Sequence, residues 1–170
     1  MSVEIWVAFV LATAVLLAIP GPTVMLVVGF ALSHGRRSAW GTVPGVALGD
    51  LTSITFSFLG LGALLSASAA VFTSVKWMGA AYLVYLGVQM WRHRPAPENG
   101  PQYAEISRAA MFRRAWTVTT LNPKSILFFV AFLPQFIVPA APPIPQMLIL
   151  GATFVAMAAL NATGYALLAE

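Results

Sequence analysis

Residues 18–26 read AIPGPTVML, and they lie inside a run from Ile5 to Leu32 that contains no charged side chain. About 20 apolar residues in a helix, at 1.5 Å each, cross the roughly 30 Å hydrocarbon core of a bilayer, so this run predicts a membrane-spanning helix. Pro20 and Pro22 interrupt such a helix, because proline lacks a backbone N–H and clashes with the preceding turn. The stretch therefore predicts a first span that is broken near its middle.

The composition of the chain is that of a membrane protein. Of the 170 residues, 59% are hydrophobic and 8% are charged, whereas a soluble domain carries about 25% charged residues. We expect an all-α integral membrane protein with a single transmembrane domain over residues 1–170. The net charge of +4 does not indicate a nucleic-acid partner, because the basic residues flank hydrophobic runs, where they act as topology signals. The lack of cysteine excludes disulfides and thiolate metal sites.

Five hydrophobic runs predict a polytopic bundle of five helices, since unpaired strands leave backbone groups unsatisfied in lipid. The predicted spans cover about 5–32, 40–65, 69–91, 115–137 and 146–168, and the polar segment of about 92–114 is expected to be a loop. The loops after the first and third spans carry or adjoin Arg36, Arg37, Arg92, Arg94, Arg108, Arg113 and Arg114. Because cytoplasmic loops are rich in arginine and lysine, these loops are expected in the cytoplasm and the N-terminus outside.

Two charged residues are predicted at the same depth as the break in the first span. Asp50 lies ten residues into the second span and Lys124 nine residues into the fourth, which places both about 15 Å deep. A charge at the membrane centre costs about 2.5 to 3.5 kcal/mol on insertion scales, so both side chains are expected to face the bundle interior. Lys76 lies closer to the outer side and is expected to anchor the third span at the interface.

A second proline interrupts the fourth span, in the sequence LNPKS at 121–125. Two broken helices three spans apart predict an inverted 3+3 repeat, with a first repeat at about 1–91 and a second at about 115–170. A half-helix that restarts at about Thr23 or after Pro123 presents unpaired N–H groups and the positive end of its dipole, which favours an anion. With Lys124 for a carboxylate, and Asp50 for an amine or a proton, these features predict a site for a zwitterion at the midplane.

Several longer motifs occur in order along nearly the whole chain: IPGPTVMLV, GRRSAWGTVPGVALGD, KWMGAAYLVYLG and LNPKSILFFVAFLPQF. Together they resemble the lysine exporter and homoserine/threonine-resistance (LysE/RhtB) family of bacterial amino-acid exporters. The resemblance implies six spans, export driven by the proton motive force and location in the plasma membrane. It also implies functional roles for Pro20, Gly21, Pro22, Asp50, Asn122, Pro123 and Lys124.

The chain shows five of these six spans, so the second repeat is expected to lack its last helix. Either the chain is a fragment, or a neighbouring copy in a homo-oligomer covers the exposed face. The sequence predicts a secondary exporter of small amino acids, such as lysine, threonine, homoserine or leucine, that acts by proton antiport. No cofactor or metal is expected, and the chain has no enzyme motif such as HExxH, GxSxG or a P-loop. A passive channel and a non-transporting scaffold, the latter because of the missing helix, stay open as alternatives.

Individual features also have structural interpretations. The prolines can simply kink the helices without lining a site. Asp50 and Lys124 can neutralise each other as an internal pair. Gly41, Gly45 and Gly49 follow each other at four-residue spacing on the second span. Because small residues let helix backbones approach closely, this stripe is expected to be a helix-packing face.

Overall fold

The computed structural model describes residues 1–67 and 106–169. It also describes positions 73–74, 77–78, 80–81, 84–85 and 88, and these scattered positions are all helical. The side chains of residues 61–67 are not among those described. Most of the predicted third span of 69–91, including Lys76, lies outside the described residues. Arg92 and Arg94 of the predicted loop lie outside them as well.

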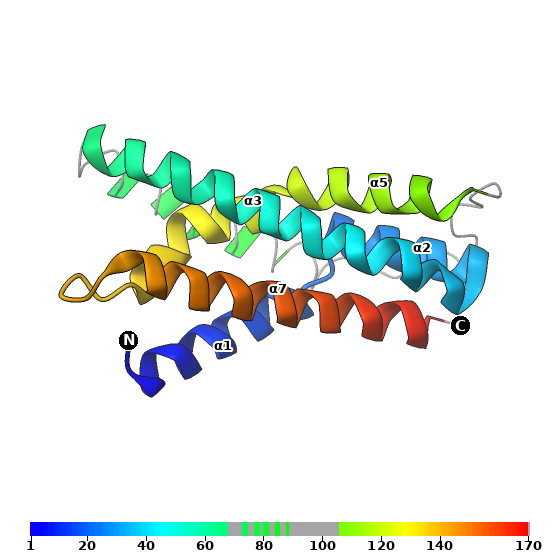
Figure 1. Cartoon of the computed structure of the whole chain (residues 1–170), viewed down its shortest axis with the longest axis horizontal. Coiled ribbons are helices and arrows are strands. Elements are labelled where there is room, and N and C mark those ends of the chain that lie inside the picture. Colours follow the sequence, from blue (N-terminus) through cyan, green and yellow to red (C-terminus); the bar gives the residue numbers. More distant parts are fainter. Residues whose placement is uncertain are drawn as a thin grey trace.

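Helices are the only regular secondary structure in the ranges that are described, which confirms the all-α class. In chain order the elements are α1 (Val3–Ala18), α2 (Pro22–His34), η1 (Gly35–Ser38), α3 (Ala39–Ala67), α5 (Arg108–Thr120), α6 (Pro123–Leu127), η2 (Phe128–Phe132), η3 (Leu133–Phe136) and α7 (Pro143–Leu168). Figure 1 shows that these helices lie along one long axis. The consecutive α1 and α2 run from the N-terminal end to the opposite end, α3 returns, α5 and α6 follow the direction of α3, and α7 runs against it (Figure 1).

The first span is broken at Pro20 to Pro22, as the sequence predicted. Helix α1 ends at Ala18, and α2 begins at Pro22 with Gly21 as its N-cap. Proline suits this first helical position, because the N–H it lacks would have no partner within the helix.

The fourth predicted span is broken in a similar way. Helix α5 ends at Thr120, α6 begins at Pro123, and the two halves of this span are bent by 41°. The predicted start of this span at about 115 is wrong, because α5 begins at Arg108 and residues 108–114 of the predicted loop are helical. The physical reason is the N-cap, since the Ser107 hydroxyl accepts a hydrogen bond from the Ala110 N–H at 3.3 Å.

Two helical stretches of the described chain are long and apolar enough to cross a membrane, Pro22–Gly60 and Pro143–Leu168, and the bent pair is a third if it counts as one span. The first stretch is not one rod. Gly35 ends α2 with a φ of 64°, a left-handed conformation that favours glycine, and α2 and α3 run in opposite directions from this turn (Figure 1). The protein is therefore a polytopic helical membrane protein, while the count of five spans stays a prediction.

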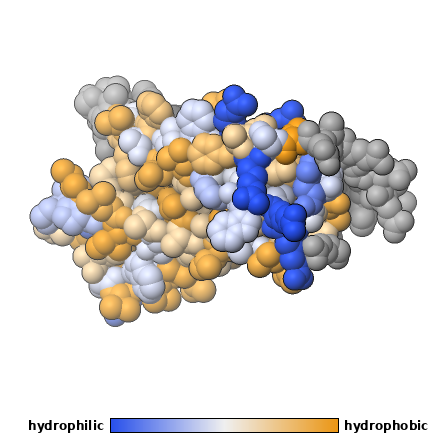
Figure 2. Space-filling model, turned by 45° about the vertical axis from the view of Figure 1, so that its right-hand side comes forward, coloured by the Kyte–Doolittle hydropathy of each residue, from blue (hydrophilic) through white to orange (hydrophobic). Residues whose placement is uncertain are grey.

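The outer surface of the bundle is apolar. Large hydrophobic side chains such as Leu11, Val15, Phe56 and Leu160 are more than half exposed. Figure 2 shows one face on which hydrophobic residues predominate and strongly hydrophilic residues form a band toward one end. This distribution is typical of a surface that contacts lipid.

Helices α3 and α5 pack closely along the glycine stripe that the sequence predicted as a packing face. A Cβ atom at Gly45 would lie 2.5 Å from the carbonyl oxygen of Phe112, and one at Gly49 would lie 2.6 Å from the Cβ of Thr119. A Cβ at Gly41 would lie 2.8 Å from the carbonyl oxygen of Arg108. Because real Cβ atoms do not approach so closely, only glycine fits at these positions, and the predicted packing role is confirmed.

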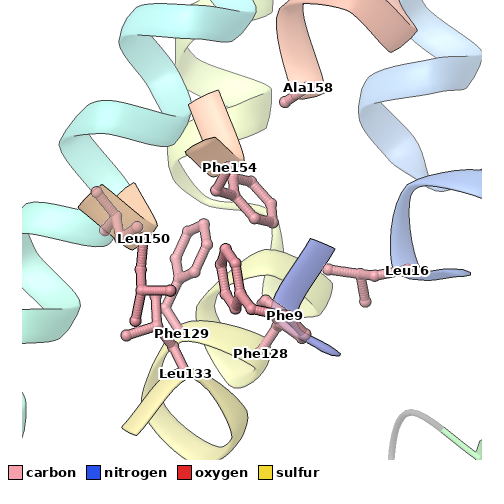
Figure 3. Packing of buried hydrophobic residues seen from close by; sticks show 9 residues of the cluster. Phe9, Leu16, Phe128, Phe129, Leu133, Leu150, Phe154 and Ala158 are labelled. Carbon is pink, nitrogen blue, oxygen red and sulfur yellow. The ribbon is translucent and has the colours of Figure 1, made fainter. Parts of the chain in front are cut away.

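Buried apolar residues form two clusters, one on each side of the helix breaks. The aromatic cluster contains Phe9, Leu16, Ile54, Phe128, Phe129, Leu133, Leu150, Phe154 and Ala158. Its rings converge from α1, η2 and α7 (Figure 3), and those of Phe129 and Phe154 meet edge to face with centroids 4.6 Å apart. The aliphatic cluster lies toward the other end of the bundle and contains Val27, Val46, Ala115, Ala162 and Ala166.

Candidate functional site

The two helix breaks meet inside the bundle. The side-chain amide of Asn122 donates a hydrogen bond to the Thr23 hydroxyl at 3.2 Å, across 99 residues of sequence. The same hydroxyl lies 3.2 Å from that of Thr119, at the end of α5. Asn122 also caps α6, because its side-chain oxygen accepts a hydrogen bond from the Lys124 N–H at 3.1 Å. A polar network therefore joins the start of α2 to the break between α5 and α6.

The ammonium of Lys124 closes the end of α1. Its Nζ donates hydrogen bonds to the carbonyl oxygens of Leu16 at 3.0 Å and Ile19 at 2.6 Å. These carbonyls lie at the C-terminal end of α1, where the usual donors four residues on are missing and the dipole is negative. The Leu16 carbonyl also accepts a hydrogen bond from the Ile19 N–H at 3.3 Å. Gly21 makes room for this contact, since a Cβ there would lie 3.4 Å from Nζ. An ammonium has three donors, so one N–H of Lys124 remains beyond these two bonds.

Asp50 is the buried acid of the same region. Its side chain is 3% exposed. Among the residues that the structure describes, its carboxylate forms neither a hydrogen bond nor an ion pair within 4.0 Å. Its charge and that of Lys124 still interact electrostatically. The two charges therefore belong to one site without forming a direct contact.

These groups line one small cavity. Its volume of about 30 Å³ is enough for one or two water molecules. Four elements and the end of α1 contribute its wall: Leu17, Gly21, Thr23, Val24, Val27, Val46, Asp50, Asn122, Lys124, Ser125, Ala158, Asn161 and Ala162. The cavity lies between the aromatic and the aliphatic clusters, because Ala158 belongs to the first and Val27, Val46 and Ala162 belong to the second.

Five of the residues predicted for the site line this cavity: Gly21, Thr23, Asp50, Asn122 and Lys124. Pro20, Pro22 and Pro123 are exposed and absent from the wall, while Pro22 and Pro123 open the two half-helices. The sequence-based prediction omitted Ser125 and Asn161. A signal existed for Asn161, which is a polar residue in an otherwise apolar helix, as Asp50 is in α3. The apolar wall residues carry no such signal, because they resemble any other residue of a span.

The described residues offer no group of three or more histidine, aspartate or glutamate side chains that could hold a metal ion. The chemistry of the site is therefore that of its buried charges and amides. One carboxylate without a partner, one ammonium and the N–H-bearing start of α2 line the same cavity. Groups of this kind complement an amine and a carboxylate on one small molecule.

Comparison with known proteins gives consistent matches along the chain. Residues 14–170 match the family model described as LysE type translocator. The chain is 39% identical over 170 residues to the homoserine/homoserine lactone efflux protein of Salmonella typhi, covering 100% of this chain and 82% of the relative. It is 40% identical over 169 residues to an uncharacterized membrane protein of Vibrio cholerae, covering 99% and 82%.

A leucine efflux protein of Klebsiella pneumoniae is 30% identical over 133 residues, which cover 78% of this chain and 63% of that protein. No solved structure matches the chain.

Proposed function

The chain belongs to the LysE type translocator family, whose named relatives are efflux proteins and not enzymes, and on that premise we propose that it exports a small amino acid in exchange for protons. The substrate binds in the cavity at the helix breaks. The observation that carries this proposal is Asp50, a buried carboxylate with no hydrogen-bond partner in the described part of the chain. An isolated buried charge is costly unless it is paired, and a substrate amine supplies the missing partner.

The carboxylate of the substrate binds across the cavity from Asp50. It is placed at the N-terminus of α2, where the first backbone N–H groups lack acceptors within the helix. The remaining N–H of Lys124 stabilises the same negative charge. A molecule that carries both charges then satisfies both walls at once. Because the cavity has a volume of about 30 Å³, it must widen as this molecule binds.

Asp50 is also the proposed proton carrier. Ser53 and Ser57 follow it on one side of α3, at spacings of three and seven residues, and both are buried. The Ser53 hydroxyl has no hydrogen-bond partner in the structure as described. Hydroxyl groups at these positions supply polar sites along α3 from Asp50 toward the N-terminal end of the bundle, which supports a proton route in that direction.

The orientation of the two broken spans supports an inverted repeat within one domain. The pair of α1 and α2 runs against the pair of α5 and α6 (Figure 1), and each pair restarts at a proline. The turn η1, with Arg36 and Arg37, and the start of α5 lie at the same end of the bundle. We place this end in the cytoplasm of a bacterial cell and the N-terminus outside, in accordance with the positive-inside rule.

The names of the relatives guide the choice of substrate. Homoserine and leucine both carry the amine and the carboxylate that the site requires, and we propose substrates of this size. Uptake of labelled homoserine and leucine into inverted membrane vesicles tests the function, because export from a cell becomes uptake there. An imposed proton gradient is expected to drive uptake by the wild type and not by Asp50→Asn.

Glu4→Gln is the matched control, since Glu4 is an exposed acid at the start of α1, away from the cavity, and this variant is expected to transport normally. Uptake that is as fast without the proton gradient would indicate a passive channel. Equal proton-driven uptake by Asp50→Asn and the wild type would reject the assigned role of Asp50.

A further inference from the structure

Helix α7 supplies a wall of the cavity that differs from the others. It contributes Ala158, Asn161 and Ala162. Asn161 is the one polar side chain in this wall, and it makes no hydrogen bond within the part of the chain that is described. Ala158 and Ala162 are buried, and their short side chains leave space beside the amide. This wall therefore combines an unused donor and acceptor with room for a few atoms.

Most polar groups of the other walls are already assigned, and the exception is the hydroxyl of Ser125 on α6, which makes no hydrogen bond in the described part of the chain. Asn122 uses its amide to bind Thr23 and to cap α6. Asp50 and Lys124 carry the two charges, which match the amine and the carboxylate of a substrate. The part of an amino acid that remains is its side chain. Asn161 on α7 offers both a donor and an acceptor for it, whereas Ser125 on α6 offers one hydroxyl group.

We propose that Asn161, between Ala158 and Ala162, forms the side-chain subsite and selects a short side chain that ends in a hydroxyl group. This inference rests on the proposed function and names the substrate class of the same cavity. A carboxamide both donates and accepts hydrogen bonds, and so does a hydroxyl group, so the two can pair in either direction. An apolar side chain of the same length leaves the amide unpaired, and sites that hydrogen-bond a substrate hydroxyl discriminate against analogues that lack it.

Homoserine and norvaline form the matched pair that tests this proposal, because they differ only in a terminal hydroxyl against a methyl group. Binding of each is measured on the purified full-length chain. The wild type is expected to bind homoserine more tightly. Asn161→Leu is expected to lower the ratio of the two affinities about tenfold, which corresponds to about 1.4 kcal/mol. Asn161→Ser, which keeps a hydroxyl in the wall, is expected to retain part of the preference.

The space beside the amide is tested by Ala158→Leu, which fills the cavity and is expected to weaken binding of both ligands at least tenfold. Ala156→Leu makes the same change at an exposed position of the same helix and is expected to bind both ligands as the wild type does. An affinity ratio that is unchanged in Asn161→Leu overturns the proposal. If Asn161→Leu does not fold, the other two variants decide. The proposal is overturned if Asn161→Ser has an unchanged ratio of homoserine to norvaline affinity and Ala158→Leu binds both ligands as the wild type does.

Vesicle transport separates this inference from the proposed function. A chain that binds homoserine selectively but transports neither ligand contradicts the exporter and supports the subsite. A chain that transports both ligands with the same preference in the wild type and in Asn161→Leu contradicts the subsite alone. A wild type that binds neither ligand contradicts both.

Discussion

The Nζ of Lys124 lies 2.6 Å from the carbonyl oxygen of Ile19, so a side chain of the second broken span closes the end of the first. The two breaks are thus parts of one arrangement. The negative end of α1 is balanced by a cation that begins the half-helix α6. Movement of α1 relative to α6 must break or replace this contact. The contact between Lys124 and Ile19 is therefore sensitive to mutation.

Lys124→Met is expected to destabilise the protein. It removes two hydrogen bonds to buried carbonyl oxygens and leaves Asp50 without its opposite charge, a change worth roughly 1 to 3 kcal/mol or more. Thermal unfolding in detergent measures the effect. The double variant Lys124→Met, Asp50→Asn is expected to be more stable than Lys124→Met alone, because no uncompensated charge remains. Equal stability of Lys124→Met and the wild type would contradict the capping role.

The contact between Asn122 and Thr23 is expected to couple the two breaks energetically. Asn122→Ala removes the N-cap of α6, which costs roughly 0.5 to 2 kcal/mol, and it also removes the donor to Thr23. Thr23→Val removes the acceptor with little change of shape. In a double-mutant cycle of unfolding free energies, the coupling is expected to reach roughly 0.5 kcal/mol or more. Strict additivity would show that the hydrogen bond contributes nothing.

The stripe of glycines on α3 is expected to tolerate no side chain. Gly45→Ala places a methyl group 2.5 Å from the Phe112 carbonyl oxygen and 2.8 Å from the Cβ of Ala115, and overpacking of this kind costs roughly 1 to 3 kcal/mol. Gly60→Ala on the same helix meets nothing within 4 Å. Because alanine has the higher helix propensity, Gly60→Ala is expected to keep or raise the unfolding temperature. A fall is expected in Gly45→Ala only, and equal changes in the two variants would contradict the packing role.

Gln146 is expected to hold the turn before α7. Its side chain accepts a hydrogen bond from the Val138 N–H and donates to the carbonyl oxygens of Val138, Ala141 and Pro142. Gln146→Leu removes these hydrogen bonds and leaves the Val138 N–H without this acceptor, although the Val138 carbonyl keeps its bond from the Ala141 N–H. The loss is expected to cost roughly 1 to 3 kcal/mol.

Gln135→Leu is the control, because this exposed side chain donates one hydrogen bond, to the Ala131 carbonyl oxygen. Amide hydrogen exchange across residues 138–142 is expected to accelerate in Gln146→Leu alone. The role assigned to Gln146 would be wrong if both variants exchanged equally.

Much of the fold could be predicted from local rules. Proline breaks helices wherever it lies, so both interruptions were visible in the sequence. The constant rise of a helix placed Asp50 and Lys124 at one depth, and the structure brings both to one cavity. The start of α5 was missed because its first turn is charged and amphipathic, while its capping residue Ser107 lies in a polar segment that looks like a loop.

The detailed contacts of the site could not be predicted in this way. Lys124 binds the carbonyls of Leu16 and Ile19 because the fold brings the start of α6 to the end of α1, and no spacing in the sequence specifies that contact. Val27 and Val46 line the cavity, while Val15 faces outward. All three are valines of a hydrophobic span, and only the rotation of each helix decides between these environments.

The two clusters that flank the cavity consist of different types of side chain. Toward the N-terminal end, the cavity is bordered by packed phenylalanine rings, and each ring is large and stiff with much contact area to lose if the helices separate. Toward the arginine-bearing end, the cavity is bordered by valine and alanine side chains. Because these side chains are small, they lose few van der Waals contacts when helices separate. Under the proposed function, we expect access to the cavity from the two ends of the bundle to face unequal barriers, with entry from the arginine-bearing end the easier of the two.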